Sequence, residues 1–429
     1  MCERFILYSD TFLWIKRENG LLYNCKSGKQ YFFILTPDIK SICNHFLNVN
    51  NLYCYPFDYT STPVSVLNFF TEIEHLGLGR YLKPSERIVV IPPLLKIEQS
   101  VERMKAQNRV ESIQVSDYLK SITIYIGGQG EKNNLYQQTL YPFDSESRLS
   151  NAQIISFVHQ AIMLSNVEIN IVITDLHDLK LPSLLKELAG YSERIKIILS
   201  YSNDRLSMLK QLIEERYSVV LLCRWDSHFE KATSLRRTEA IHWHFLVRDE
   251  EGMSAALSFC ENMNSDMYEI IPIADNNLGF FRSNVFLNSD ELKTIHVSKS
   301  QIYIHQTLNV NSFGKIVIMP DGAVFSNVLQ PSIGTINDSL YDLILKELLE
   351  NHSWRVVRHS RHCDNCIYQW LCPSPTNYEV LLGHNRVCNF SDKDLLSFQA
   401  GTYSEIKTIS FLTNPPKRLF SAAIYLHRS

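Results

Sequence analysis

The sequence lacks the features of several large protein classes. None of its 429 residues belongs to an uninterrupted apolar run of about 18 to 20, which a membrane-spanning helix needs. The N-terminus has no basic region followed by a long apolar run and a small-residue cleavage site, which argues against a signal peptide. Lysines and arginines number 42 against 45 aspartates and glutamates, so no basic field attracts nucleic acid. We therefore expect a cytoplasmic protein without a membrane span or a nucleic-acid partner.

A disulfide framework is also unlikely in a reducing compartment, although the chain has 10 cysteines. Six of them are scattered, and each fits a small buried residue: Cys2, Cys25, Cys43, Cys54, Cys223 and Cys260. The other four lie within 26 residues near the C-terminus: Cys363, Cys366, Cys372 and Cys388. Two cysteines separated by two residues can direct both sulfurs at one metal, and two more complete a four-thiolate set. The spacing predicts a metal centre, either zinc or an iron–sulfur cluster.

The first unit, residues 1–85, is expected to be a small β/α module. Strands are predicted at 11–16, 21–25 and 31–35, the first two joined by a turn at 18–20. A helix then begins at Pro37, with Thr36 as its N-cap. Apolar residues at helical spacing predict a second helix over 66–76.

Beyond a linker at 86–114, strands and helices alternate regularly. Strands are predicted at 121–126, 168–174, 194–200, 217–223, 241–247 and 268–273, and helices at 151–165, 182–188, 204–215, 228–240 and 252–263. Such alternation predicts parallel βα units. Six units favour an α/β fold with a partial (βα)6 TIM-like barrel over 115–295, although a doubly wound open sheet gives the same pattern.

The pattern changes after residue 295. A hairpin is predicted from strands at 315–319 and 323–325 around an Asp321-Gly322 turn, and a helix over 339–350. The cysteine segment follows, so residues 296–390 form one expected domain. Residues 391–429 are interpreted as a C-terminal tail.

Six βα units followed by this cysteine segment resemble a radical SAM enzyme with a C-terminal SPASM domain, over residues 115–390. In that family the SPASM domain usually carries two auxiliary four-iron clusters. The outer-cluster ligands match all four clustered cysteines of this chain. The inner-cluster ligands are missing. The family has a cysteine five positions after the glycine that matches Gly322, and this chain has Asn327 there. Thr376 stands where the family has the last cysteine of its C-x2-C-x5-C-x3-C run, and no early cysteine lies between Cys260 and Cys363. The resemblance therefore implies one [4Fe-4S] cluster at Cys363, Cys366, Cys372 and Cys388, and favours it over zinc.

The radical-generating residues of the family are also missing. Its C-x3-C-x2-C loop belongs after the first barrel strand, where residues 129–138 contain no cysteine, and its Gly-Gly-Glu motif is replaced at 174–178. The whole resembles the pseudo-radical-SAM SPASM proteins of Bacteroidales systems that modify ribosomally made peptides (RiPPs), most strongly at residues 372–379. The resemblance implies a non-catalytic accessory protein that binds a precursor peptide, a partner radical SAM maturase, or both, without S-adenosylmethionine. The first unit resembles the winged-helix RiPP recognition element, which binds leader peptides by strand addition.

Two alternatives remain open: a zinc-bound interaction protein, and a metal-dependent enzyme that uses other chemistry in the barrel mouth. His242 and His244 share one face of a predicted strand by alternation. Asp175, His177 and Asp178 follow a strand end, where barrel sites usually lie. Cys223 ends another strand and is a candidate nucleophile, although no activating group is recognisable beside it.

Overall fold

The computed structural model describes residues 3–83, 85–88, 115–128, 135–136, 139–140, 145–164, 167–173, 178–201, 206–224, 241–263 and 268–389. The predicted helix over 228–240, the tail and most of the linker lie outside these residues. Within these ranges, every helix is too short or too polar to cross a bilayer.

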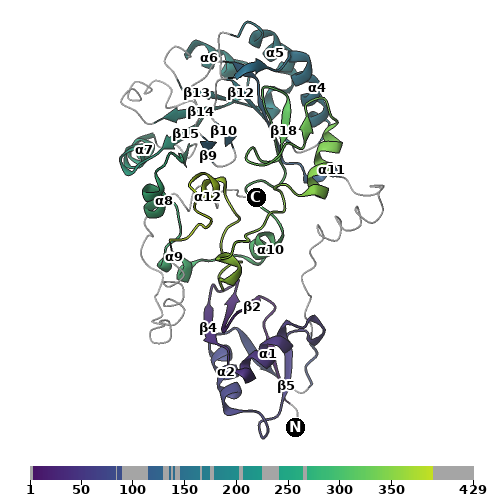
Figure 1. Cartoon of the computed structure of the whole chain (residues 1–429), viewed down its shortest axis with the longest axis vertical. Coiled ribbons are helices and arrows are strands. Elements are labelled where there is room, and N and C mark those ends of the chain that lie inside the picture. Colours follow the sequence, from purple (N-terminus) through teal and green to yellow (C-terminus); the bar gives the residue numbers. More distant parts are fainter. Residues whose placement is uncertain are drawn as a thin grey trace.

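The N-terminal module contains two three-stranded antiparallel sheets and two helices (Figure 1). The predicted strands and helices are confirmed as β2 (Thr11–Lys16), β3 (Asn19–Asn24), β4 (Gln30–Ile34), α1 (Pro37–Leu47) and α2 (Val64–His75). Thr36 caps α1, because its Oγ1 accepts a hydrogen bond of 3.3 Å from the Ile39 amide. A second sheet was not predicted: β1 (Glu3–Leu7) lies between β5 (Cys54–Phe57) and β6 (Gly79–Leu82). Its strands are short, and Pro56 in β5 is a residue that argues against a strand.

A nine-stranded sheet forms the centre of the larger body. The six predicted parallel strands are confirmed as β7 (Ser121–Tyr125), β12 (Glu168–Ile173), β13 (Ile195–Ser200), β14 (Ser218–Arg224), β15 (Ile241–Val247) and β16 (Tyr268–Pro272). From β7 to β16 the neighbours in the sheet follow chain order, and residues 315–318 add a parallel strand on the other side of β7. The strands therefore form one large, mostly parallel sheet whose order turns at β7.

The two faces of this sheet differ in chemistry. One face packs its isoleucines, leucines and valines against the crossover helices: α4 (Asn151–Ile162), α5 (Leu181–Leu188), α6 (Leu206–Glu214) and α7 (Glu250–Met263). The register places charged and polar side chains on the other face. There Glu269 of β16 and Lys315 interact electrostatically, although five strands separate them in the sheet. The sheet therefore curls around a polar lumen.

The hairpin predicted after residue 315 is confirmed as β17 (Lys315–Ile318) and β18 (Ala323–Phe325), and β19 (Gly334–Thr335) continues it. Its position was not predicted: β17 pairs in parallel with β7 and extends the barrel sheet. Two strands this far apart in sequence produce no local sequence pattern that would predict their pairing.

The cysteine region lies between the barrel and the N-terminal module (Figure 1). Helix α11 (Leu340–Glu350) was predicted, and Ser339 caps it. Helices α8 (Leu278–Asn284), α9 (Ser289–Thr294), α10 (Lys299–Thr307) and α12 (Asn377–Leu381) were not predicted. The remaining elements are the short strands β8 (Gly127–Gly128), β9 (Leu135–Tyr136), β10 (Thr139–Leu140) and β11 (Ser145–Arg148), and 3-10 turns at Val49–Asn51, Val115–Tyr118, Ala189–Arg194 and Cys363–Asn365.

Candidate metal centre

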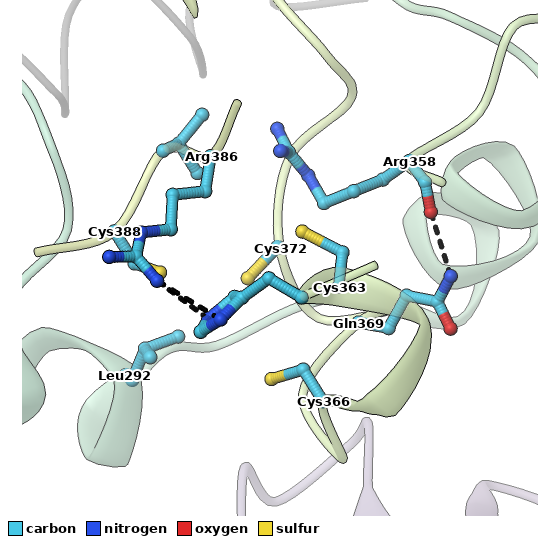
Figure 2. Close-up of a pocket in the computed structure, with 10 residues that line it drawn as sticks. Leu292, Arg358, Cys363, Cys366, Gln369, Cys372, Arg386 and Cys388 are labelled. Atoms are coloured by element: carbon cyan, nitrogen blue, oxygen red, sulfur yellow. Dashed lines mark hydrogen bonds between the residues drawn. The ribbon is translucent and has the colours of Figure 1, made fainter. Parts of the chain in front are cut away.

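The fold brings all four clustered cysteines to one pocket. Cys363 opens a single 3-10 turn, Cys366 follows that turn, and Cys372 lies six residues further on. Cys388 joins them because it bridges to Leu287 at the end of α8. Figure 2 shows their sulfur atoms around a common space, and no cysteine of the four is more than 8% exposed.

The pocket encloses about 330 Å³ of space, part of it open to solvent. It is also lined by Leu292, Arg358, His362, Gln369, Arg386 and Val387. Within the described ranges, no three cysteine, histidine or carboxylate side chains are close enough together to chelate a single ion. Tetrahedral zinc needs its sulfurs about 3.8 Å apart, from Zn–S bonds of about 2.3 Å. Four thiolates can hold either a zinc ion or a four-iron cluster, so the ligand set is compatible with both.

A buried cation lies beside the sulfurs. Arg358 is 4% exposed and forms an ion pair with Glu379, at 2.6 Å between Nη1 and Oε1. It also donates hydrogen bonds to the carbonyl oxygens of Pro373 and Ser374. Burial alone would lower the pKa of Arg358, but Glu379 and the nearby thiols outweigh burial and raise it. Arg358 therefore stays charged next to any thiolate in the pocket.

Two of the four thiols, those of Cys366 and Cys372, are protonated when nothing is bound to them. Burial raises the pKa of Cys366 to about 12, and that of Cys372 well above its ordinary value. Thiolates, not thiols, are metal ligands, so metal binding has to displace these protons. Metal binding at this pocket would therefore be coupled to proton release.

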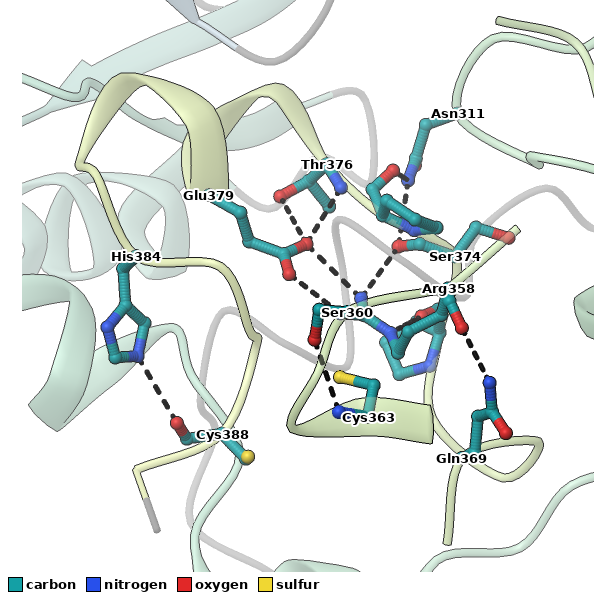
Figure 3. A network of polar contacts seen from close by, with 12 residues as sticks. Asn311, Arg358, Ser360, Cys363, Gln369, Ser374, Thr376, Glu379, His384 and Cys388 are labelled. Carbon is teal, nitrogen blue, oxygen red and sulfur yellow. Dashed lines mark hydrogen bonds and ion pairs between the residues drawn. The ribbon is translucent and has the colours of Figure 1, made fainter. Parts of the chain in front are cut away.

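Backbone contacts hold the cysteine segment in place (Figure 3). The Cys363 amide donates to Ser360 Oγ at 3.1 Å, and the Cys366 amide donates to the Cys363 carbonyl at 3.0 Å. At the other end, His384 Nε2 donates to the Cys388 carbonyl at 3.3 Å. These contacts orient the loops that carry the sulfurs.

A second buried site contains no thiol. Asn327 and Asn377 exchange two side-chain hydrogen bonds, of 2.8 and 3.0 Å, and are 8% and 6% exposed. Next to Asn377, the Thr376 amide donates to Glu379 Oε2 at 2.8 Å. Asn327 and Thr376 are the positions where the family pattern has inner-cluster cysteines. The sequence marked both positions as substitutions, but the amide pair between residues 50 apart was not predicted.

Among the other candidates, His242 and His244 share the lumen face, as predicted. They are the second and the fourth of the seven residues of β15, so neither lies at its carboxyl end, where the barrel mouth was expected. His244 Nε2 is 3.5 Å from Glu269 Oε2, and burial, with Lys196, lowers the pKa of His244 to about 4. In the folded protein this histidine is therefore neutral at pH 7.

Asp178 has a structural role, because its Oδ2 is 2.5 Å from Arg148 Nε and its Oδ1 accepts from the Lys180 amide. Asp175 and His177 lie outside the described residues. Cys223 is 1% exposed, and its Sγ is 3.8 Å from the Leu221 carbonyl oxygen. A thiol this deeply buried does not reach a substrate.

No protein-family model and no curated protein matches the chain. Among solved structures, SuiB of Streptococcus suis bound to precursor peptide SuiA is 10% identical and has a TM-score of 0.40, over 90% of this chain and 99% of that one. SuiB bound to S-adenosylmethionine is 11% identical, with a TM-score of 0.38 over 86% and 94%. Native anSMEcpe with bound AdoMet and Cp18Cys peptide is 11% identical, with a TM-score of 0.39 over 66% and 97%. TM-scores this low do not establish a shared fold, so the function has to be argued from this chain's own residues.

Proposed function

We propose that this chain is a non-catalytic accessory protein of ribosomal peptide maturation that binds one four-iron cluster. The observation that carries the proposal is the pocket itself: four buried cysteines surround one space, beside a buried arginine. When bound, such a cluster supplies a cross-link between loops and a site for one electron. The chain's own contribution is Arg358, whose positive charge offsets the charge of the thiolates.

The side chains at the carboxyl ends of the parallel strands support a non-catalytic role. Barrel chemistry usually occurs at the carboxyl ends of the strands. On the lumen face there, Tyr125, Val172 and Val317 form a buried apolar cluster, with none of them more than 5% exposed. The sequence also has no cysteine between Cys54 and Cys223, so the loop after β7 cannot hold a three-cysteine cluster.

The N-terminal module offers a place for a precursor peptide. Among the described strands β4 pairs with β3 alone, so it is an edge strand of its sheet, and strand addition takes place at sheet edges. Helix α2 lies beside it, because the Phe69 ring is 4.8 Å from that of Phe33. Ile34 at the end of β4 is 52% exposed. An edge strand with a helix next to it is the arrangement that binds an extended peptide.

Iron and sulfide analysis tests the cluster. After anaerobic reconstitution we expect about four iron atoms and about four sulfide ions per chain, and absorbance at about 400 nm. Incubation with S-adenosylmethionine and a reductant should then give no 5′-deoxyadenosine. Stoichiometric zinc without sulfide would contradict the cluster, and appreciable 5′-deoxyadenosine would contradict the non-catalytic role.

Calorimetry with the precursor peptide encoded beside the gene tests the peptide site. Ile34→Arg should weaken binding at least tenfold, because it places a bulky charge at the edge of β4. Val49→Arg is the matched control, since Val49 is 65% exposed outside this sheet. Equal binding by both variants would place the peptide elsewhere, or on a partner maturase.

The metal-dependent enzyme is the second candidate, because His242, His244 and Glu269 share the polar lumen, where they would have to move closer together to bind one ion. Metal analysis distinguishes the two. A second metal that is lost in a His242→Ala variant, while the iron remains, would favour the enzyme.

A further inference from the structure

The turn between β2 and β3 touches the cysteine segment directly. Lys16 Nζ donates to Gln369 Oε1 at 3.0 Å, and Arg17 Nε donates to Asn365 Oδ1 at 3.1 Å. Asn365 lies between Cys363 and Cys366, and Gln369 lies between Cys366 and Cys372. Both loops that separate the first three cysteines thus provide a contact for the N-terminal module.

Gln369 connects this contact to the pocket. It is 1% exposed and lines the pocket, and its amide nitrogen donates to the Arg358 carbonyl at 2.7 Å. The amide oxygen of the same side chain accepts from Lys16. One buried side chain therefore joins the cysteine loop, the loop that carries Arg358, and the hairpin.

A second connection runs through α10. His305 Nδ1 donates to the Trp370 carbonyl at 3.1 Å, within the cysteine segment. The same helix contacts the module, because Lys299 Nζ donates to the Ser9 carbonyl at 2.7 Å and the Tyr303 ring lies 5.5 Å from that of Phe12. Figure 1 shows α10 close to both parts.

The β2–β4 sheet transmits this contact to the proposed peptide edge, because its two faces pack on different parts of the protein. Leu13 and Leu22 face the core of the N-terminal module, whereas Trp14 and Tyr23 belong to the core of the larger body. Tyr23 Oη donates to the Val297 carbonyl at 2.9 Å and accepts from the Val297 amide at 2.6 Å. Movement of the hairpin would therefore move β4 relative to the body.

The cysteine segment has little regular structure of its own. Its one element between Cys363 and Cys372 is a 3-10 turn of three residues. Loops that carry several metal-ligand cysteines commonly become ordered only when the metal binds. The contacts with Lys16 and Arg17 depend on that order.

From these contacts we infer that the cluster controls how the N-terminal module docks: cluster binding orders residues 363–372, which fixes the β2–β3 hairpin and with it the β4 edge. This inference rests on the proposed cluster. By linkage, docking also helps the protein to retain the cluster. The cluster then regulates access of the peptide, even though it takes no part in bond chemistry.

Hydrogen exchange at the Val297 amide tests the inference, because that amide donates to Tyr23 of the docked hairpin. Removing the cluster with an oxidant and a chelator should accelerate exchange over residues 295–299 about tenfold, whereas peptides from α1 and α2 stay unchanged. Lys16→Met combined with Arg17→Ala should accelerate the same exchange in protein that carries the cluster, with iron still at about four per chain. Lys40→Met, an exposed lysine on α1, is the matched control and should change nothing.

Unchanged exchange at 295–299 after proven loss of iron would overturn the inference while leaving the proposed cluster intact. Accelerated exchange in α1 and α2 as well would also overturn it, because the module would then be unfolding rather than undocking. A protein that never binds iron would overturn the proposed function, and the inference with it.

Discussion

Two neighbouring sites join distant parts of the C-terminal region: the cysteine pocket and the Asn327–Asn377 pair. In the pocket, buried thiols with raised pKa values line a space that protein atoms leave open. At the amide pair, two side chains satisfy each other through hydrogen bonds of 2.8 and 3.0 Å. The first site would need an added group to fill its space, as we propose, and the second is already filled by its own side chains.

The difference lies in how each site satisfies its buried polar groups. A buried amide that is fully hydrogen-bonded costs little, whereas a buried polar group without a partner costs about 1 to 3 kcal/mol. Asn327 and Asn377 avoid that cost because each supplies both a donor and an acceptor. Thiols are only weak hydrogen-bond donors and acceptors, so four of them cannot form an equally strong set of mutual contacts.

Replacing a pocket cysteine should have the largest effect. Cys366→Ser should lower iron from about four per chain to below one, because the cluster loses a corner ligand. Structural metal sites contribute on the order of 10 kcal/mol to folding, so the melting temperature should fall as well. Cys260→Ala is the matched control, as Cys260 is 2% exposed on α7, and full iron loss there would refute the assignment.

Breaking the ion pair beside the pocket should come next. Arg358→Met should destabilise the protein by about 3 to 5 kcal/mol in urea unfolding, because it leaves the Glu379 carboxylate buried and unpaired. Arg358→Met combined with Glu379→Gln should recover part of this loss, since glutamine still accepts from the Thr376 amide. An equal loss in both variants would show that the charge pair is not the cause.

Opening the amide pair should cost less and leave the cluster in place. Asn327→Ala should destabilise the protein by about 1 to 3 kcal/mol, because the Asn377 amide loses its buried partner. Asn327→Ala with Asn377→Ala should cost less than the sum of the single changes. Iron content should stay the same in all three variants, and its loss would show that the two sites are one unit.

The smallest effect concerns pH. The pKa of Cys366 is about 12 in the fold and near 9.0 in its ordinary state. Above pH 9 the unfolded chain releases this proton while the folded chain keeps it, so cluster-free protein should lose stability as pH rises from 9 toward 12. Over the first pH unit, from 9 to 10, the loss is about 1 kcal/mol. Loaded protein should lack this component, because its thiols are already deprotonated; identical slopes by urea unfolding would contradict their ligation.

Much of the fold follows from local patterns. The six parallel strands and most crossover helices were predicted because apolar periodicity records which side of each element is buried. Thr36 and Ser339 marked two helix starts for a similarly local reason. The short strands β1, β5 and β6 escaped prediction because they are brief and one contains a proline.

The sequence by itself determined which residues are chemically able to hold a metal, since four closely spaced cysteines are visible without any fold. Only the tertiary structure decided what surrounds them: the pairing of β17 with β7, the amide pair, the ion pair of Arg358, and the docking of Lys16 on Gln369. Each of these joins residues that are far apart along the chain. Local propensity carries no information about such contacts, because their energy arises only when packing removes both partners from water.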